Sequence, residues 1–152
     1  MFTLQYKMMA AVLQSVIFLI QECSQLEYET YIHPHTRPLF SGPKTVQASV
    51  TLLDSLPIFL EKTSQEELEQ DILPMLYLAM ASSMSQVQMA AASAVPTILD
   101  YLCDDVIRVE LVPRVRSVYL TNEGDVKIVL SLLACIAKVI LEKCSACPHS
   151  YP

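Results

Sequence analysis

The amino-acid sequence contains a pattern that returns after 40 residues. The tetrapeptide Ser-Gln-x-Glu begins at Ser24 and again at Ser64, and each copy is followed ten residues later by a proline, Pro34 or Pro74. A weaker third copy lacks the tetrapeptide but keeps a proline, Pro113, 39 residues after Pro74. A fixed period of this length is typical of repeat proteins, whose units stack in a row. Stacked repeats usually form surfaces for partners, so the period favours binding over catalysis.

The repeating unit is predicted to be helical. Only two of the 152 residues are glycine, which argues against a β-sandwich or a nucleotide-binding loop. Ser-Gln-x-Glu also has the form of a capping box, in which the serine and the glutamate satisfy backbone N–H groups at a helix start. About seven helices are therefore expected, with approximate bounds 4–22, 24–40, 44–62, 65–82, 86–102, 104–120 and 125–143.

Apolar residues recur at helical spacing within these segments, which places them on one face of each helix. Three faces are clearest. They are Val46, Val50, Leu53, Leu56 and Leu60; Leu68, Ile72, Leu76 and Ala79; and Val126, Val129, Leu133, Ile136 and Ile140.

Prolines fall inside the predicted helices at a constant phase of the repeat. Pro34, Pro74 and Pro113 are expected to kink the first helix of each unit, and Pro57 and Pro96 the second. An interior proline removes one backbone hydrogen bond and bends the helix. The alternative is that these prolines end helices and create short additional turns.

The helices are expected to pair antiparallel into repeats. The fold class predicted for residues 1–143 is therefore an all-α, right-handed α-solenoid. Within it, residues 1–23 would be the second helix of a partial repeat. The complete repeats are predicted at 24–62, 64–102 and 104–143, and a disordered tail at 144–152.

Charge and hydropathy exclude several partners. A net charge of −6 without a basic stripe disfavours nucleic acid and anionic membranes. Apolar residues 8–20 mimic a signal peptide, but Gln14 and Ser15 interrupt them and no cleavage motif follows. An odd number of cysteines without a dense framework favours a reducing, cytoplasmic location. A secreted repeat protein cleaved near Cys23 remains an alternative.

The sequence predicts no catalytic, cofactor-binding or metal-binding residue and no enzyme activity. Cys144 and Cys147 have C-x-x-C spacing, but a zinc site needs a second pair and a redox site a βαβ context. His33 and His35 are two residues apart and would face different sides of a helix. A small redox protein using Cys144 and Cys147 is the enzyme alternative.

The third unit combines Leu111, Pro113 and Val115 with Asp125-Val126-Lys127 and an apolar helix, and it resembles a HEAT repeat. The second unit departs from that pattern, with Gln86 and Gln88 near its turn. Five further groups of residues occur in a fixed order: Glu22-Cys23 with Glu27-Tyr28, Ile72-Leu73-Pro74-Met75-Leu76-Tyr77, Val87-Gln88, Val95-Pro96-Thr97 and Leu111-Val112-Pro113-Arg114-Val115. Together they resemble the HEAT region of SCY-like pseudokinases, closest to the coated-vesicle-associated branch, over about residues 10–143.

The resemblance implies a non-catalytic, protein-binding scaffold in clathrin-associated vesicle traffic, cytoplasmic and associated with Golgi, endosome or coated vesicles. Clathrin-coat or adaptor components would be partners through the full-length protein, with no nucleic acid, no cofactor and no membrane insertion. The alternative is a HEAT scaffold of the nuclear-transport or phosphatase-regulatory type. The last helix is also predicted to leave five apolar residues uncovered, Val129, Leu132, Leu133, Ile136 and Ile140, so the chain is expected to self-associate through its ends.

Overall fold

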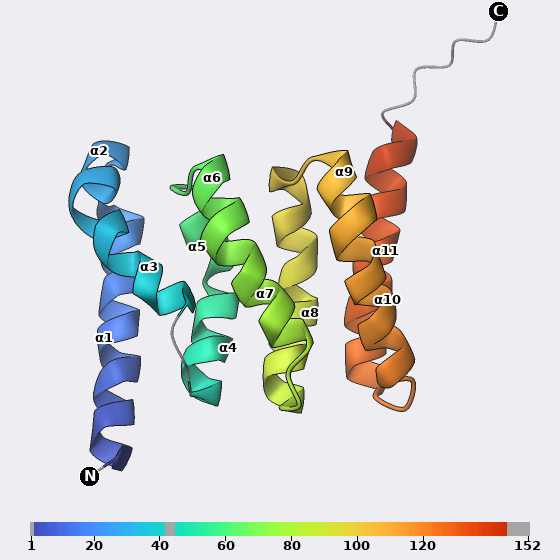
Figure 1. Cartoon of the computed structure of the whole chain (residues 1–152), viewed down its shortest axis with the longest axis horizontal. Helices are drawn as coiled ribbons and strands as arrows, with labels where there is room; N and C mark the ends of the chain where they lie inside the picture. Colours follow the sequence, from blue (N-terminus) through green and yellow to red (C-terminus); the bar gives the residue numbers. More distant parts are fainter. Residues whose placement is uncertain (1, 42–44, 146–152) are drawn as a thin grey trace, which may run out of the picture.

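The protein is a row of α-helices, seen side by side in Figure 1. This computed structural model describes residues 2–41 and 45–145, and no strand occurs among them. The elements run in the order α1 (Phe2–Glu22), α2 (Gln25–Glu27), η1 (Tyr28–Ile32), α3 (His33–Ser41), α4 (Val46–Asp54), α5 (Leu56–Leu60), α6 (Gln65–Glu67), η2 (Leu68–Ile72), α7 (Leu73–Met80), α8 (Ser85–Ile98), η3 (Leu99–Tyr101), α9 (Asp104–Val106), η4 (Ile107–Leu111), α10 (Val112–Thr121) and α11 (Val126–Ser145).

The helices form two layers. In one layer α1 packs on α4 and α5, these pack on α8, and α8 packs on α11. In the other layer α3 contacts η2, and α7 contacts α10. Each unit contains one helix from each layer, and the two pack against each other. Thus α7 packs on α8, and α10 packs on α11. The chain is therefore an all-α solenoid, as predicted. The hand of the solenoid and the repeat boundaries stay predictions.

Both capping boxes form as the sequence predicts. The Ser24 backbone N–H donates to Glu27 Oε2 over 2.8 Å, and the Ser64 N–H donates to Glu67 Oε2 over 2.7 Å. In return the serine hydroxyls accept from the Glu27 and Glu67 N–H groups, each over 3.3 Å. These reciprocal bonds satisfy donors that a helix start leaves without an intrahelical partner. The repeated tetrapeptide thus fixes where two helices begin.

The three phased prolines follow π-helical turns, which the sequence analysis did not foresee. Segments η1, η2 and η4 end two residues before Pro34, Pro74 and Pro113. In η2 the Leu73 N–H reaches back five residues to the Leu68 carbonyl. This wider turn leaves room for the proline ring and absorbs the lost bond, so the helix continues through the proline.

The prediction for Pro57 was wrong. The helix breaks at Ser55, whose φ and ψ of −95° and 3° are not helical, and Pro57 lies in the first turn of α5. A first-turn proline has no N–H to leave unpaired, so it suits a helix start. Pro96, by contrast, lies inside α8, which runs on to Ile98.

The core is apolar and continuous along the row. On the face predicted for the third helix, Leu53, Leu56 and Leu60 are buried. All four residues of the face predicted for the fourth helix are buried: Leu68, Ile72, Leu76 and Ala79. Met75 and Met80 are also buried in it.

The uncovered side predicted for the last helix is confirmed for Leu133, Ile136 and Ile140, which are exposed, and is wrong for Leu132, which is buried. Among the described side chains of α11, Ile128, Leu132 and Cys135 are buried, and Val126 is exposed. Helix α11 is apolar on two sides, and periodicity alone cannot tell which of them packs inward.

Two free cysteines differ in burial: Cys103 is exposed, whereas Cys135 is buried. The tail predicted at residues 144–152 is wrong for Cys144 and Ser145, which belong to α11. The rest of that predicted tail, residues 146–152, lies outside the described residues.

Candidate interaction surfaces

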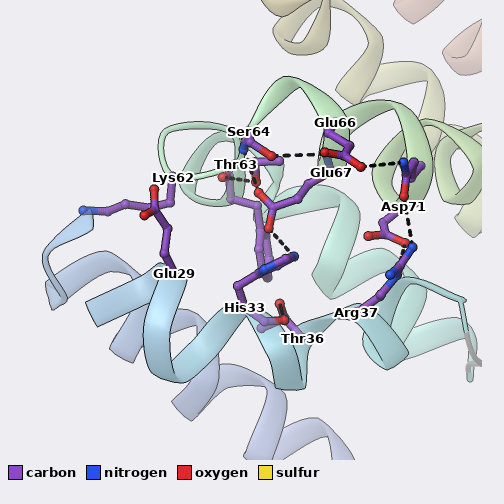
Figure 2. A network of polar contacts seen from close by, with 12 residues as sticks. Glu29, His33, Thr36, Arg37, Lys62, Thr63, Ser64, Glu66, Glu67 and Asp71 are labelled. Atoms are coloured by element: carbon purple, nitrogen blue, oxygen red, sulfur yellow. Dashed lines mark hydrogen bonds and ion pairs between the residues drawn. The ribbon is translucent and has the colours of Figure 1, made fainter. Parts of the chain in front are cut away.

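Polar side chains join the first two units in the layer that contains α3 and α7. His33 pairs with Glu67, and Arg37 Nε donates to Asp71 Oδ1 over 3.1 Å, while an Arg37 terminal nitrogen donates to Gln70 Oε1 over 3.1 Å. Figure 2 shows the basic residues reaching from one helix to the carboxylates of the next. This network fixes the register between neighbouring helices.

The carboxylates of this network are bonded to neighbouring groups. Glu67 does close a capping box and also accepts from His33. Asp71 is largely covered and is bonded to Arg37. Because these oxygens bond to side chains of the preceding helix, the network joins neighbouring helices.

The second and third units meet through a different pair at a related position. The Arg114 guanidinium lies over the Tyr77 ring, 4.0 Å from its centroid, and Arg114 also donates to the Glu110 carbonyl over 2.8 Å. Burial raises the pKa of Tyr77 to about 12, and the nearby Glu110 carboxylate adds to the rise. The contact combines cation–π attraction with the packing of a large ring.

Lysines join neighbouring helices in the other layer. Lys62 Nζ donates to the Cys23 carbonyl just beyond α1 over 2.8 Å. Lys138 Nζ donates to the Pro96 carbonyl over 2.6 Å and to Asp100 Oδ2 over 3.0 Å near the end of α8. A cation near a helix C-terminus satisfies carbonyls and complements the helix dipole. Each lysine thus stabilises the end of the helix before it.

An apolar hollow of about 240 Å³ lies between the first and second units. Its rim includes Leu78 and Met84, which are exposed, and its wall includes the buried residues Phe40, Met75 and Val87. Met84 is flexible and polarizable, a side chain that adapts to partners. Residues more than 40 positions apart form this hollow, and no single segment of the sequence signals it.

A second apolar groove of about 320 Å³ lies between α10 and α11. Val112, Tyr119 and Leu133 are exposed along it, while Leu111 and Val115 form its buried floor. The sequence analysis anticipated uncovered apolar residues on α11 but not the contribution of α10. Leu132 was placed among the uncovered residues and is in fact fully buried.

The candidates for chemistry named from the sequence do not assemble. Among residues 2–41 and 45–145 no three His, Cys, Asp or Glu side chains are grouped so as to hold a metal ion. His33 pairs with Glu67, while His35 is exposed. Cys147 lies outside the described residues. No helix in the described part of the chain is long and apolar enough to cross a membrane.

The arrangement of the helices defines the class of the chain, an all-α solenoid. Along 133 residues, 88% of its length, the chain is 26% identical to SCY1-like protein 2 of Homo sapiens, and equally to that of Mus musculus. The chain covers 14% of the length of these relatives. No family model matches it, and no solved structure does. The similarity falls in a wholly helical region, which fits a non-catalytic segment.

Proposed function

We propose that this chain is a non-catalytic protein-interaction scaffold of HEAT type, corresponding to a helical region of an SCY1-like protein. The observation that carries the proposal is the similarity to SCY1-like protein 2 along 88% of the chain. The stacked helices support it, because such arrays expose long surfaces for partners. The contacts between units support it as well, since committed polar groups hold a rigid frame.

The partners that we propose are clathrin-coat or adaptor components, engaged in the cytoplasm at Golgi, endosome or coated vesicles through the full-length protein. The apolar hollow beside Met84 is the surface that we assign to a partner side chain. It is concave, it has exposed apolar residues at its rim, and it lies away from both ends of the row. An anchor residue that fills such a pocket supplies much of the energy of an interface.

Affinity purification from cytosol tests this function with two matched variants. Met84→Asp places a charge at the rim of the hollow, and Asp suits the N-cap position that Met84 occupies before α8, so folding is not at risk. Leu120→Asp changes an equally apolar, exposed residue outside the hollow.

We expect the unchanged chain and Leu120→Asp to retain coat or adaptor proteins, and Met84→Asp to retain about tenfold less. Retention of nuclear-transport cargo or phosphatase subunits in their place would contradict the trafficking role. Equal retention by both variants would remove the hollow from the proposal but leave the scaffold role standing.

A further inference from the structure

A second hollow, of about 490 Å³, lies between the second and third units. It is lined mainly by residues near the C-terminal ends of α7 and α10, and Ser82 lines both this hollow and the apolar hollow beside Met84. The turns that join α7 to α8 and α10 to α11 lie at the same edge of the row in Figure 1. The two hollows are therefore neighbours along one edge of the solenoid. We call the second one the polar hollow, after the lining residues Gln88, Arg114, Ser117 and Asn122.

The two hollows occupy equivalent places in consecutive units. The prolines of the second and third units are 39 residues apart, and at this offset Met75 corresponds to Arg114 and Leu78 to Ser117. Met75 and Leu78 line the apolar hollow, whereas Arg114 and Ser117 line the polar one. The repeat thus builds the same hollow twice, and the residues at two equivalent positions change its chemistry from apolar to polar.

Gln88 adds a polar group to the wall of the polar hollow. Its position is apolar in the other units, where Ala48 and Ile128 are buried. Gln88 is itself only 9% exposed, and its Nε2 donates to the Met80 carbonyl over 2.9 Å. A buried amide costs free energy unless it is hydrogen-bonded, and this bond offsets the cost and holds the side chain in place. A carboxamide carries a second N–H, so Gln88 keeps a donor beyond the bond to Met80.

The charge of the polar hollow comes from Arg114. Among the described residues that line the hollow, Arg114 is the only charged one, and the others with polar side chains carry hydroxyl or amide groups. The guanidinium stacks by its face on Tyr77 and donates to the Glu110 carbonyl, and it forms no ion pair with the described residues. Its N–H groups lie in the guanidinium plane, so stacking leaves donors for a ligand. A carboxylate complements such a site, because charge-assisted hydrogen bonds are the strong ones.

The distance between the hollows suits an extended peptide. Neighbouring packed helices lie about 8–10 Å apart, and equivalent points of consecutive units should be separated by about that much. In polyproline II conformation, side chains three residues apart lie on the same side of the chain and are about 9 Å apart. A segment in this conformation along the edge of the row would place one side chain in each hollow.

We propose that the two hollows bind one extended segment of the partner protein, with an apolar side chain in the apolar hollow and an acidic side chain, three residues away, in the polar hollow. The inference rests on the function proposed above, because the apolar hollow is the surface assigned there to a partner. It adds the chemistry of that partner. Burial of the apolar side chain anchors the segment, and Arg114 with the neighbouring hydroxyl and amide donors selects the carboxylate.

Synthetic peptides containing Leu-Pro-Pro-Asp or Asp-Pro-Pro-Leu test the pair of sites, since either chain direction satisfies the spacing. Titration of the full chain followed by nuclear magnetic resonance measures even weak binding. For the better of the two peptides, we expect about tenfold weaker binding when asparagine replaces the aspartate, because the charge on the acceptor is lost. The advantage of aspartate should shrink as salt is added.

An exchange of residues between the equivalent positions tests the assignment of the hollows. Arg114→Met combined with Ser117→Leu gives the polar hollow the residues that the apolar hollow has, so the fold should accept them. We expect this double variant to prefer a peptide with leucine in place of the aspartate, a reversal that general destabilisation cannot produce. Arg116→Met is the control, because Arg116 is exposed but does not line the polar hollow, and it should keep the preference for aspartate.

Gln88→Leu removes the amide at a position where the other units are apolar, so folding should be preserved. We expect weaker binding of the aspartate peptide and unchanged binding of the leucine peptide. Circular dichroism of every variant checks that the helices remain folded.

Three results would overturn the proposal: no binding of either aspartate peptide, equal binding of the aspartate and asparagine peptides, or a double variant that still prefers aspartate. None of them would refute the proposed function, because retention of partners that depends on Met84 does not require the polar hollow. Conversely, loss of the scaffold role would show as absent retention by the unchanged chain in the affinity purification.

Discussion

At the scale of single residues, Tyr77 carries the least expected feature. Its hydroxyl is buried and has no hydrogen-bond partner among the described residues, while its ring stacks with Arg114. A buried hydroxyl without a partner costs free energy, and deleting it can be neutral or stabilising. The ring, not the hydroxyl, therefore holds the second and third units together.

Tyr77→Phe tests this separation of ring from hydroxyl. Near pH 7 we expect a free energy of unfolding that is unchanged or higher by up to about 1 kcal/mol, because the packing is kept and an unpaired group is removed. Urea unfolding measures it. A loss of more than about 1 kcal/mol would show that the hydroxyl bonds in a way the structure does not contain.

The raised pKa of Tyr77 predicts that the free energy of unfolding decreases at alkaline pH. The fold favours the neutral phenol, with a pKa of about 12 against an ordinary value of 10.0, so its stabilisation is complete below pH 10 and is lost as pH rises from 10 to 12. Tyr77→Phe should lose less stability over that range in urea unfolding. Tyr101→Phe removes an exposed hydroxyl and serves as control. If the free energy of unfolding fell equally between pH 10 and 12 in both variants, the prediction would be contradicted.

At the scale of elements, the capping boxes and π-turns decide where helices begin and how they pass their prolines. Residue types predicted the boxes, since serine and glutamate three positions apart have one favourable local arrangement. The prolines predicted a disturbance at a constant phase, but not its form. A kink, a break and a π-turn all accommodate a missing N–H, and packing against neighbouring helices selects among them.

Ser64→Ala should lower the free energy of unfolding by about 1 kcal/mol, because Glu67 N–H loses the acceptor that the serine oxygen provides. Thermal or urea unfolding would measure the change. Ser83→Ala, an exposed serine in the turn before α8, is the control and should change stability by less than about 0.5 kcal/mol. Equal effects of the two substitutions would mean that the box adds nothing to the fold.

At the scale of the whole molecule, each helix is supported only by its neighbours in the row. Helix α8 packs on α4 and α5 at one side and on α11 at the other, whereas α11 packs on α8 alone in its layer. In such arrays stability is close to a sum of local terms and contacts between adjacent units. The ends of the row should therefore open more readily than its middle.

Amide hydrogen exchange measures this gradient. At concentrations where the chain is monomeric, we expect the strongest protection in α8 and the weakest in α1 and α11. A helix that packs on one side only loses fewer contacts when it opens locally, so its opening costs less free energy. Raising the concentration should protect the outer helices selectively if copies stack. Uniform protection at low concentration would contradict the row-like distribution of stability.

The sequence by itself determined that the chain is helical, where two of its helices start, and that its units repeat about every 40 residues. These properties follow from local chemistry: capping residues, few glycines and apolar spacing act within a few turns of chain. The prediction of a scaffold without catalytic residues came from the same period and from family resemblance.

Only the tertiary structure decided which of the two apolar sides of α11 packs inward, that Pro57 starts a helix, and that residues far apart form the hollow beside Met84. Periodicity fixes the spacing of apolar residues around a helix but not the neighbour that each side meets. In a row of helices almost every helix is apolar on more than one side. Burial is therefore set by position in the row, a property that no single segment encodes.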